Sequence, residues 1–273
     1  MSLPESVPQI FEPDYYQRLY DIEERHGWAM GMRDAMLALL RRSLAGRKHL
    51  RVLDIGCGTG YLLEYLKRRF SLAGEPVGID ISSYALTFCR QRGASAVALA
   101  NAAQTSFASD TFDLIVCIDT LQHLSPAGAD RLALIEFARL LRPGGVIYLR
   151  TNSALGHVPL TSVDPDQYRR YRLENVATML AEAGLRVERA TYLNAIPGAW
   201  ALLREYARAG QRPAAAIGPG LSIRPYPPHL AWLNRVMHGL LAFEAWLIGA
   251  LRFNLPFGHS TAFVAQRPAE MEG

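Results

Sequence analysis

Residues 52–60 read VLDIGCGTG, an apolar strand pattern that runs into a turn containing Gly56, Gly58 and Gly60. Glycine permits a positive φ and lets the backbone approach a ligand closely. A helix-period segment follows at 60–70, and the next strand pattern, 76–81 (PVGIDI), carries Asp80 20 residues after Gly60. In βαβ nucleoside sites an acidic residue at about this spacing accepts the ribose hydroxyls. The two segments together predict a nucleoside site at one edge of a sheet.

The charge of this turn distinguishes between two kinds of nucleoside ligand. Asp54 precedes the glycines, so the pattern is D-x-G-x-G-x-G, whereas dinucleotide sites have G-x-G-x-x-G. A carboxylate is unfavourable beside a pyrophosphate but suits a ligand that carries an ammonium and a sulfonium group. We therefore favour a cationic nucleoside over a dinucleotide. An ordinary strand-to-helix turn without a ligand is the third interpretation.

Alternating strand and helix patterns surround this unit. Short apolar runs separated by helix-period segments predict a parallel sheet covered on both faces. The expected strands are 50–55, 76–81, 95–99, 112–118, 145–151, 185–192 and 260–266, and the expected helices between them are 60–70, 83–92, 129–141 and 173–183. The expected divisions of the chain are an N-terminal helical cap at 1–48, the core at 49–192, a helical insertion or lid at 193–259, and the last core strand with the tail at 260–273.

The insertion before the last strand has an unusual composition. Residues 210–228 contain five prolines and three glycines, which predicts a loop between helices at about 198–208 and 229–251. The second helix is apolar nearly all round, which predicts burial on more than one face. It would close a pocket, pair with a second copy in a homodimer, or rest on a membrane surface. Because Asn234, Arg235, His238 and Glu244 interrupt it, we expect no membrane span.

The overall composition excludes several classes of protein. The 273 residues are half hydrophobic and one-fifth charged, which is typical of a soluble protein with a core and not of a disordered chain. A net charge of +4 is too small to favour a nucleic-acid partner. Three cysteines without CxxC spacing and an N-terminus without a signal-peptide pattern predict reduced thiols in a cytoplasmic protein. His157 and Asp164 have no third partner at ligand spacing, so no metal site is expected.

Several motifs in order resemble those of the class I S-adenosylmethionine-dependent methyltransferases. The matching segments are VLDIGCGTG (52–60), VGIDIS (77–82), Ala100-Asn101-Ala102, FDLIV (112–116), Leu121-Gln122-His123 and LRPGG (141–145). The resemblance covers about 50–192 and implies an α/β Rossmann-like sheet of seven strands with an antiparallel last strand at 260–266. It also implies S-adenosyl-L-methionine as the methyl donor and S-adenosyl-L-homocysteine as the product.

The resemblance assigns a role to each residue of the expected cofactor site. Asp54 and the amides of Gly56 and Gly58, in the motif that Gly60 closes, would hold the methionine moiety, and Asp80 would accept both ribose hydroxyls. Ile81 would pack on the adenine, whose edge Asn101 and Ala102 would bind, and Asp119 would line the floor near the sulfonium. The competing interpretation of Asp119 is an N-cap for a helix at 120–124.

A base is required only if the acceptor is protonated, as an alcohol, phenol or ammonium would be. His123 follows the fourth strand at the carboxyl edge and is the first candidate, while a structural histidine is the alternative. His157 and Tyr168 lie in the segment after the fifth strand, where acceptor contacts are common in this family. Tyr168-Arg169-Arg170-Tyr171 resembles the H-R-R-Y of bacterial methyltransferases found beside glycosyltransferase and secondary-metabolite genes, and its tyrosine puts a base at that position in doubt.

Aromatic residues near the N-terminus, Tyr15, Tyr16, Tyr20 and Trp28, would hold the sulfonium or pack a helix on the sheet edge. The sequence as a whole predicts methyl transfer to oxygen or nitrogen of a small-molecule acceptor. An RNA or protein acceptor is the first alternative. The second is an enzyme of the same fold that binds the cofactor but catalyses another reaction, such as a cyclisation.

Overall fold

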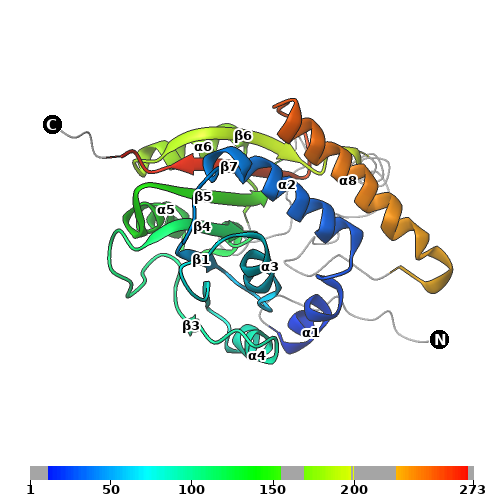
Figure 1. The fold of residues 1–273 in the computed structure, drawn as a ribbon, viewed down its shortest axis with the longest axis horizontal. Helices are drawn as coiled ribbons and strands as arrows, with labels where there is room; N and C mark the ends of the chain where they lie inside the picture. The colour runs from blue at the N-terminus through cyan, green and yellow to red at the C-terminus, as the bar shows by residue number, and fades with distance from the viewer. Residues whose placement is uncertain (1–11, 155–168, 198, 200–225, 270–273) are drawn as a thin grey trace.

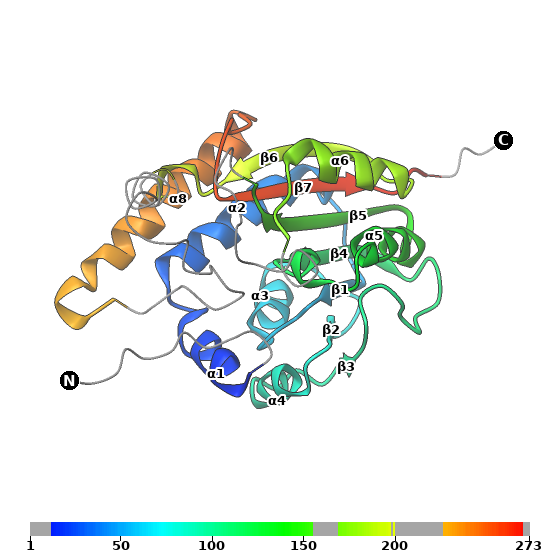
Figure 2. The ribbon, with the colours of Figure 1, turned by 180° about the vertical axis from the view of Figure 1, so that it is seen from behind.

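A seven-stranded mixed sheet forms the centre of the computed structural model, which describes residues 12–154, 169–197, 199 and 226–269 (Figures 1 and 2). The strands are β1 (Val52–Ile55), β2 (Val77–Asp80), β3 (Val97–Leu99), β4 (Phe112–Ile118), β5 (Leu141–Asn152), β6 (Arg186–Leu193) and β7 (Ser260–Gln266). Their order is β3-β2-β1-β4-β5-β7-β6, and β7 alone runs antiparallel to both of its neighbours. This arrangement confirms the predicted fold class.

Helices cover both faces of the sheet because its strands carry apolar side chains on both sides. On one face Val52, Leu114 and Val116 pack against α2 (Gly27–Ser43), α3 (Tyr61–Arg69) and α8 (Trp232–Ala250). On the other, Leu53 and Ile115 pack against α5 (Ala129–Leu140) and α6 (Leu173–Glu182). The helices α1 (Pro13–Ile22) and α4 (Ser83–Gln91) contact each other beside β2 and β3 (Figure 1).

Most predicted elements lie within one or two residues of the observed ones, and β4 and β7 match their predictions fully. The exception is β5, which begins at Leu141 and not at 145, because Phe112 of β4 pairs with Leu141 before a register shift. The predicted helix 198–208 and loop 210–228 lie almost wholly outside the described residues. The three cysteines are buried free thiols, as predicted.

The helix α8 packs lengthwise on α2, so that the N-terminal cap and the insertion form one helical layer (Figure 1). Gly27 and Gly31 allow this close approach: a Cβ at Gly27 would lie 2.0 Å from the carbonyl oxygen of Asn234, and one at Gly31 would lie 2.2 Å from Cβ of Leu241. The side chain of Asn234 also accepts a hydrogen bond from the Gly27 amide (2.5 Å) and donates one to the Arg25 carbonyl (2.7 Å).

The prediction that this apolar helix is buried on more than one face is wrong. Only one side of α8, which carries Leu241, Glu244, Ala245 and Ile248, is buried, and a second apolar side is exposed. Among the described residues, no helix combines the length and the hydropathy needed to cross a bilayer.

Candidate active site

A cavity of about 1170 Å³ lies along the carboxyl edge of the sheet. Its floor comes from residues at or just beyond the ends of four adjacent parallel strands, Asp80 (β2), Asp54 (β1), Asp119 (β4) and Arg150 (β5), and continues to Ser260 at the start of β7. With neighbouring strands about 4.8 Å apart, the span from β2 to β7 is about 19 Å. α1 and α2 contribute Tyr15, Tyr16, Trp28 and other residues to its wall.

Asp80 is held in one orientation by the backbone. Its two carboxylate oxygens accept hydrogen bonds from the amides of Gly58 (2.9 Å) and Ser82 (2.8 Å). Burial raises the pKa of this carboxyl, and the backbone amides partly offset that rise. Each oxygen can still accept a second bond, so the carboxylate is positioned to take two donors from the cavity.

Asp54 is the most unusual group in the site. It is buried beneath the turn, and its Oδ2 has no hydrogen-bond partner although it belongs to the cavity lining. Burial raises its pKa to about 8, and the negative charges of Asp80 and Glu23 add to the effect. A buried carboxylate without a partner is costly, and a cation bound in the cavity would relieve that cost.

The amides of the turn's glycines have partners within the protein. The amide of Gly56 donates to the carbonyl of Ile79 (2.8 Å), and the Gly58 amide donates to Asp80 (2.9 Å), so their predicted contact with the methionine moiety stays a prediction. Both residues line the cavity, and a Cβ at Gly56, where φ is +73°, would lie 1.9 Å from Oγ1 of Thr120. Because these glycines have no side chains, they leave room beside the turn and allow its backbone conformation.

Gly60 is not among the residues that line the cavity, and its predicted contact with the cofactor stays a prediction. It precedes α3 with a φ of +82°, and a Cβ there would lie 3.0 Å from Cα of Cys89 in α4. This close approach and the positive φ are a structural reason for glycine at this position.

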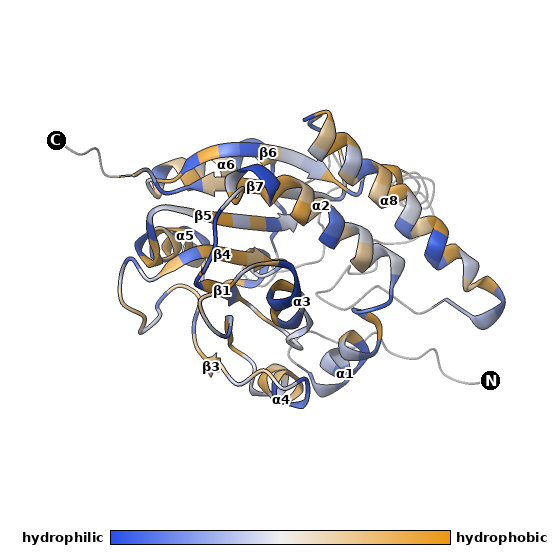
Figure 3. Ribbon diagram, viewed as in Figure 1, coloured by the Kyte–Doolittle hydropathy of each residue, from blue (hydrophilic) through white to orange (hydrophobic). Residues whose placement is uncertain are grey.

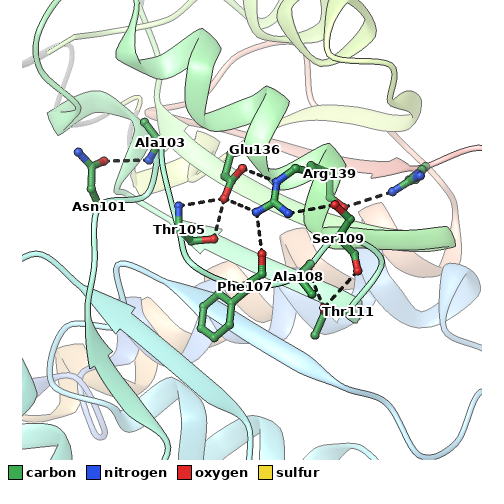
Figure 4. A network of polar contacts seen from close by, with 10 residues as sticks. Asn101, Ala103, Thr105, Phe107, Ala108, Ser109, Thr111, Glu136 and Arg139 are labelled. Atoms are coloured by element: carbon green, nitrogen blue, oxygen red, sulfur yellow. Dashed lines mark hydrogen bonds and ion pairs between the residues drawn. The ribbon is translucent and has the colours of Figure 1, made fainter.

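The residues expected around the adenine lie together at the β2–β3 end of the cavity. Ile81, 61% exposed, Asn101 and Ala102 all line it. The Asn101 side-chain oxygen accepts the Ala103 amide (2.9 Å), which fixes the turn. Figure 4 shows how the loop is anchored further along: Glu136 of α5 accepts the Thr105 amide and hydroxyl, and Arg139 binds Glu136 and the Phe107 carbonyl.

Asp119 lines the cavity, but it is not an N-cap. The short helix at Leu121–His123 has Thr120 as its N-cap residue and no side-chain cap. Asp119 instead forms a two-point ion pair with Arg150, whose Nε donates to Oδ1 (3.2 Å) and whose Nη2 donates to Oδ2. The Arg150 guanidinium also lies 5.2 Å from the ring centroid of Trp28. The sequence analysis did not identify Arg150, because the apolar pattern of β5 does not show which of its side chains lines the cavity.

The N-terminal helices are fastened to the turn by a second ion pair that sequence reasoning missed. Glu23, just after α1, accepts bonds from the hydroxyl of Thr59 and from Arg92 of the loop after α4 (2.9 Å). Arg92 also donates to the carbonyls of Thr59 (3.1 Å) and Tyr20 (3.0 Å), and it stacks on the Tyr20 ring at 4.1 Å. Burial raises the pKa of Glu23 to about 7 against the opposing effect of these donors.

The four N-terminal aromatic residues therefore separate into two groups. Tyr15, Tyr16 and Trp28 line the cavity, whereas Tyr20 does not and packs on Phe88 and Arg92. For Tyr15, Tyr16 and Trp28, ligand contact and packing both remain possible roles, whereas Tyr20 is a packing residue.

Of the candidate bases, His123 lines the cavity, and His157 and Tyr168 lie outside the described residues. Two further histidines that the sequence did not single out, His26 and His259, also line it. His26 stacks on Tyr226 with ring centroids 5.4 Å apart, which joins the N-terminal cap to the segment before α8. Within the described residues, no three His, Cys, Asp or Glu side chains are grouped as metal ligands.

Comparison with known proteins now places this site in a family. Residues 53–149, which contain β1, β2 and β4 with their turns, match the family model described as a methyltransferase domain. These residues form a methyltransferase domain, and the sheet around them has the fold of S-adenosylmethionine-dependent methyltransferases. The chain is similar to a ubiquinone biosynthesis O-methyltransferase of Rhizobium etli, at 29% identity over 189 residues that cover 60% of this chain and 74% of the relative.

Solved structures show the methyltransferase's fold in proteins of distant sequence. A SAM-dependent methyltransferase from Archaeoglobus fulgidus is 19% identical, with a TM-score of 0.52 over 89% of this chain and 97% of that one. The [4+2]-cyclase SpnF is also 19% identical, with a TM-score of 0.53 over 86% of this chain and 82% of that one. At such identities the likeness concerns the fold alone, and the reaction has to be argued from the site.

Proposed function

We propose that the cavity binds S-adenosylmethionine over β2, β1 and β4 and a small-molecule acceptor over β4, β5 and β7, and that the enzyme methylates an oxygen or nitrogen of that acceptor. One observation supports this most strongly: Asp54, whose buried Oδ2 has no hydrogen-bond partner, lines the same cavity as the preoriented Asp80. A ligand that carries both a cation and a pair of hydroxyls satisfies both groups. S-adenosylmethionine has this combination in its α-ammonium and its ribose.

The remaining assignments follow from positions along the edge. Asp80 would accept the ribose hydroxyls with the capacity that the Gly58 and Ser82 amides leave. Ile81 would pack on the adenine, and Asn101 and Ala102 would lie at its edge. Asp54 would take the α-ammonium, which leaves Asp119 nearest to the transfer point in the order of the strands.

The bound cofactor supplies a methyl group that is already activated for displacement. The protein's own task is to align the acceptor with that methyl group and to exclude water, and such alignment contributes up to about 7–11 kcal/mol. The Arg150–Asp119 pair and the Trp28 ring form a fixed wall for this purpose. His123 is the proposed base for an acceptor that must lose a proton.

The acceptor end of the cavity combines apolar and polar groups, which favours an apolar molecule carrying a hydroxyl or amine. Its lining includes Trp28, Leu62, Ile118, Tyr226 and Met237 on the apolar side, and Gln122, Arg150, Asn194 and Ser260 on the polar side. The relative named for ubiquinone biosynthesis is an O-methyltransferase, which supports oxygen as the acceptor atom. A macromolecular acceptor and a non-methylating reaction are the alternatives, and the labelling experiment below distinguishes them from methylation of a small molecule.

Titration calorimetry with S-adenosylhomocysteine tests the cofactor assignment. Asp80→Asn should weaken binding roughly 30-fold or more, because two hydrogen bonds to a charged acceptor are weakened. Glu182→Gln is the matched control, since Glu182 is an exposed partner of Arg131, and should bind like the wild type. An absence of wild-type binding, or equal binding by Asp80→Asn, would contradict the assignment.

The acceptor class is tested separately with methyl-labelled S-adenosylmethionine and a bacterial extract separated into small molecules, RNA and protein. We expect label in the small-molecule fraction, and loss of that label in Asp54→Asn. Label in RNA or protein would establish a macromolecular acceptor. Conversion of an acceptor without transfer of label would establish another reaction.

A further inference from the structure

The outer side of α8 carries an exposed apolar stripe, formed by Trp232, Val236, Leu240, Phe243 and Trp246. Their spacing of three or four residues places them on one side of the helix. Trp232, Phe243 and Trp246 are 51–52% exposed, and Phe243 stacks on Trp246 with ring centroids 5.8 Å apart. Figure 3 shows α8 at the margin of the molecule.

Three further large apolar residues that follow the helix in the chain, Leu251, Phe253 and Phe257, are also exposed. We call these three residues and the five on α8 the α8 face. A soluble monomer rarely exposes so many large apolar side chains in one row. The packing of α8 on α2 does not need them, because that contact uses the opposite side of the helix.

The exposed charge of α8 itself is positive. Arg235 is the exposed charged residue of the helix, and its single acid, Glu244, is buried and accepts the amides of Ala195 (3.2 Å) and Ile196 (2.7 Å). The nearby Asp34 is paired with His238 at 2.8 Å and Glu188 with Arg186 at 3.0 Å. In the part of the chain that the structure describes, α8 therefore exposes a cation, and these two neighbouring acids already have partners.

A cluster of arginines lies at the C-terminal end of the helix. Arg189 donates to the Ile248 carbonyl (3.4 Å) and to the Asn254 side chain (2.8 Å), which fixes it beside the last turn of α8. Burial lowers the pKa of Arg189, and the positive charges of Arg252 and Arg42 lower it further. An anionic partner would relieve this repulsion.

These features favour a lipid surface over a second copy of the chain. In a two-fold contact between antiparallel copies of α8, the arginines at its C-terminal end would lie opposite the end that carries Arg235, so among the described residues cations would face cations. Exposed Trp and Phe beside arginines are instead typical of helices that lie in the headgroup region of an anionic bilayer. Because α8 keeps its opposite side on α2, such a contact needs no rearrangement of the fold.

We propose that the α8 face docks this methyltransferase on the surface of an anionic phospholipid bilayer, with α8 lying parallel to the membrane plane and Arg42, Arg189 and Arg252 facing the phosphate groups. The proposal goes beyond methyl transfer and does not depend on the acceptor assigned above. Met237, on the same helix, lines the cavity, so docking would place the acceptor end of the active site beside the lipid.

Sedimentation with sucrose-loaded vesicles tests the docking. The full chain should sediment with phosphatidylcholine vesicles that contain 30% phosphatidylglycerol, bind far less to pure phosphatidylcholine, and be released by salt as the charges are screened. The double variant Phe243→Ser and Trp246→Ser should partition roughly tenfold less, because two half-exposed aromatic side chains no longer enter the interface. Arg252→Gln should weaken partitioning about fivefold.

Matched controls lie elsewhere on the surface. Leu132→Ser with Ile135→Ser removes two equally exposed apolar side chains from α5, and Arg68→Gln removes an exposed cation that pairs with Glu64. Both should sediment like the wild type. Equal partitioning of the α8 variants and their controls, or no binding of the wild type to anionic vesicles, would overturn the proposal.

Two further measurements cover the other outcomes. Sedimentation velocity would overturn the proposal if it showed a dimer that the Phe243/Trp246 variant dissociates and that binds no vesicles, since the α8 face would then belong to a second copy. If circular dichroism shows that the double variant does not fold, brominated phospholipids on the wild type decide the matter. Quenching of its tryptophan fluorescence supports docking, and unquenched fluorescence refutes it.

Discussion

The buried Asp54 makes a quantitative prediction about how cofactor binding depends on pH. Its pKa in the empty protein is about 8, so about nine-tenths of the molecules carry a neutral carboxyl at pH 7. If the α-ammonium of the cofactor binds the ionised form, binding must release that proton. We therefore expect release of about 0.9 proton per cofactor at pH 7 and a rise in affinity of about 50-fold between pH 6 and pH 8, with a plateau above.

Calorimetry measures both quantities directly. Titrations of S-adenosylhomocysteine at pH 7 in two buffers of different ionisation enthalpy give the number of protons exchanged, and titrations from pH 6 to pH 8.5 give the affinity profile. Asp54→Asn keeps the shape of the side chain but cannot ionise, so its binding should be weaker, nearly independent of pH and without proton release. Asp113→Asn, a change to a carboxyl outside the cavity that pairs with Arg142, is the control. Proton uptake by the wild type, or the same release in Asp54→Asn, would refute the reasoning.

The same group affects the stability of the empty protein with a defined sign. A carboxyl whose pKa rises from its ordinary value near 4 to about 8 on folding stabilises the fold fully below pH 4, and that contribution is lost as the pH rises to 8. The melting temperature of the wild type should therefore fall over this range relative to that of Asp54→Asn. A wild-type curve parallel to that of Asp54→Asn would show that the carboxyl is not held neutral.

Two further predictions concern how the helical layer is held. Arg92→Met should lower the free energy of unfolding in urea by about 3 kcal/mol, because Glu23 loses its buried partner. Arg68→Met, at an exposed pair, should lower it by less than about 0.5 kcal/mol. Equal losses would contradict the proposal that the Glu23–Arg92 pair fixes the N-terminal helices. Gly27→Ala should destabilise the protein by about 1–3 kcal/mol, because the added methyl group collides with Asn234. Gly239→Ala, whose added methyl group meets nothing within 4 Å, should stabilise the protein by about 0.5–1 kcal/mol. Equal melting temperatures of the two variants would mean that α8 does not pack closely on α2 at Gly27.

The sequence predicted the sheet and the cavity floor because both depend on local patterns. An apolar run such as FDLIVCI at β4 forms a strand wherever it lies, and residues at the carboxyl ends of neighbouring parallel strands must share one edge. That is why Asp54, Asp80 and Asp119 meet at one cavity although up to 65 residues separate them. The motif could not show that the amides of Gly56 and Gly58 already donate to Ile79 and Asp80.

The missed residues owe their roles to partners far away in the chain. Arg92 is fixed by Glu23, and Gly27 by Asn234, and neither segment carries a periodicity that identifies its partner. For α8 the composition was read correctly as apolar, but hydropathy counts the apolar residues of a helix without showing which side the protein covers. Only the packing of Leu241 and Ile248 on α2 reveals that Phe243 and Trp246 stay outside.

The charges along the cavity floor separate the part proposed for the cofactor from the part proposed for the acceptor. Asp80, Asp54 and Asp119 follow one another from β2 to β4, and the first cation, Arg150, comes at β5. The carboxylates favour a cationic cofactor over β2, β1 and β4. An unpaired carboxylate beside the sulfonium would, however, stabilise the cation before methyl transfer. Only interactions that are stronger in the transition state than in the starting complex accelerate the transfer. The two-point pairing of Arg150 with Asp119 would reduce that stabilisation where the methyl group leaves. Asp54 and Asp80, which no arginine contacts among the described residues, would hold the ends of the cofactor that do not change charge. In the proposed reaction, Asp54 and Asp80 therefore serve cofactor affinity, and Asp119, paired with Arg150, serves methyl transfer. The sequence pattern of β5 did not reveal this arginine.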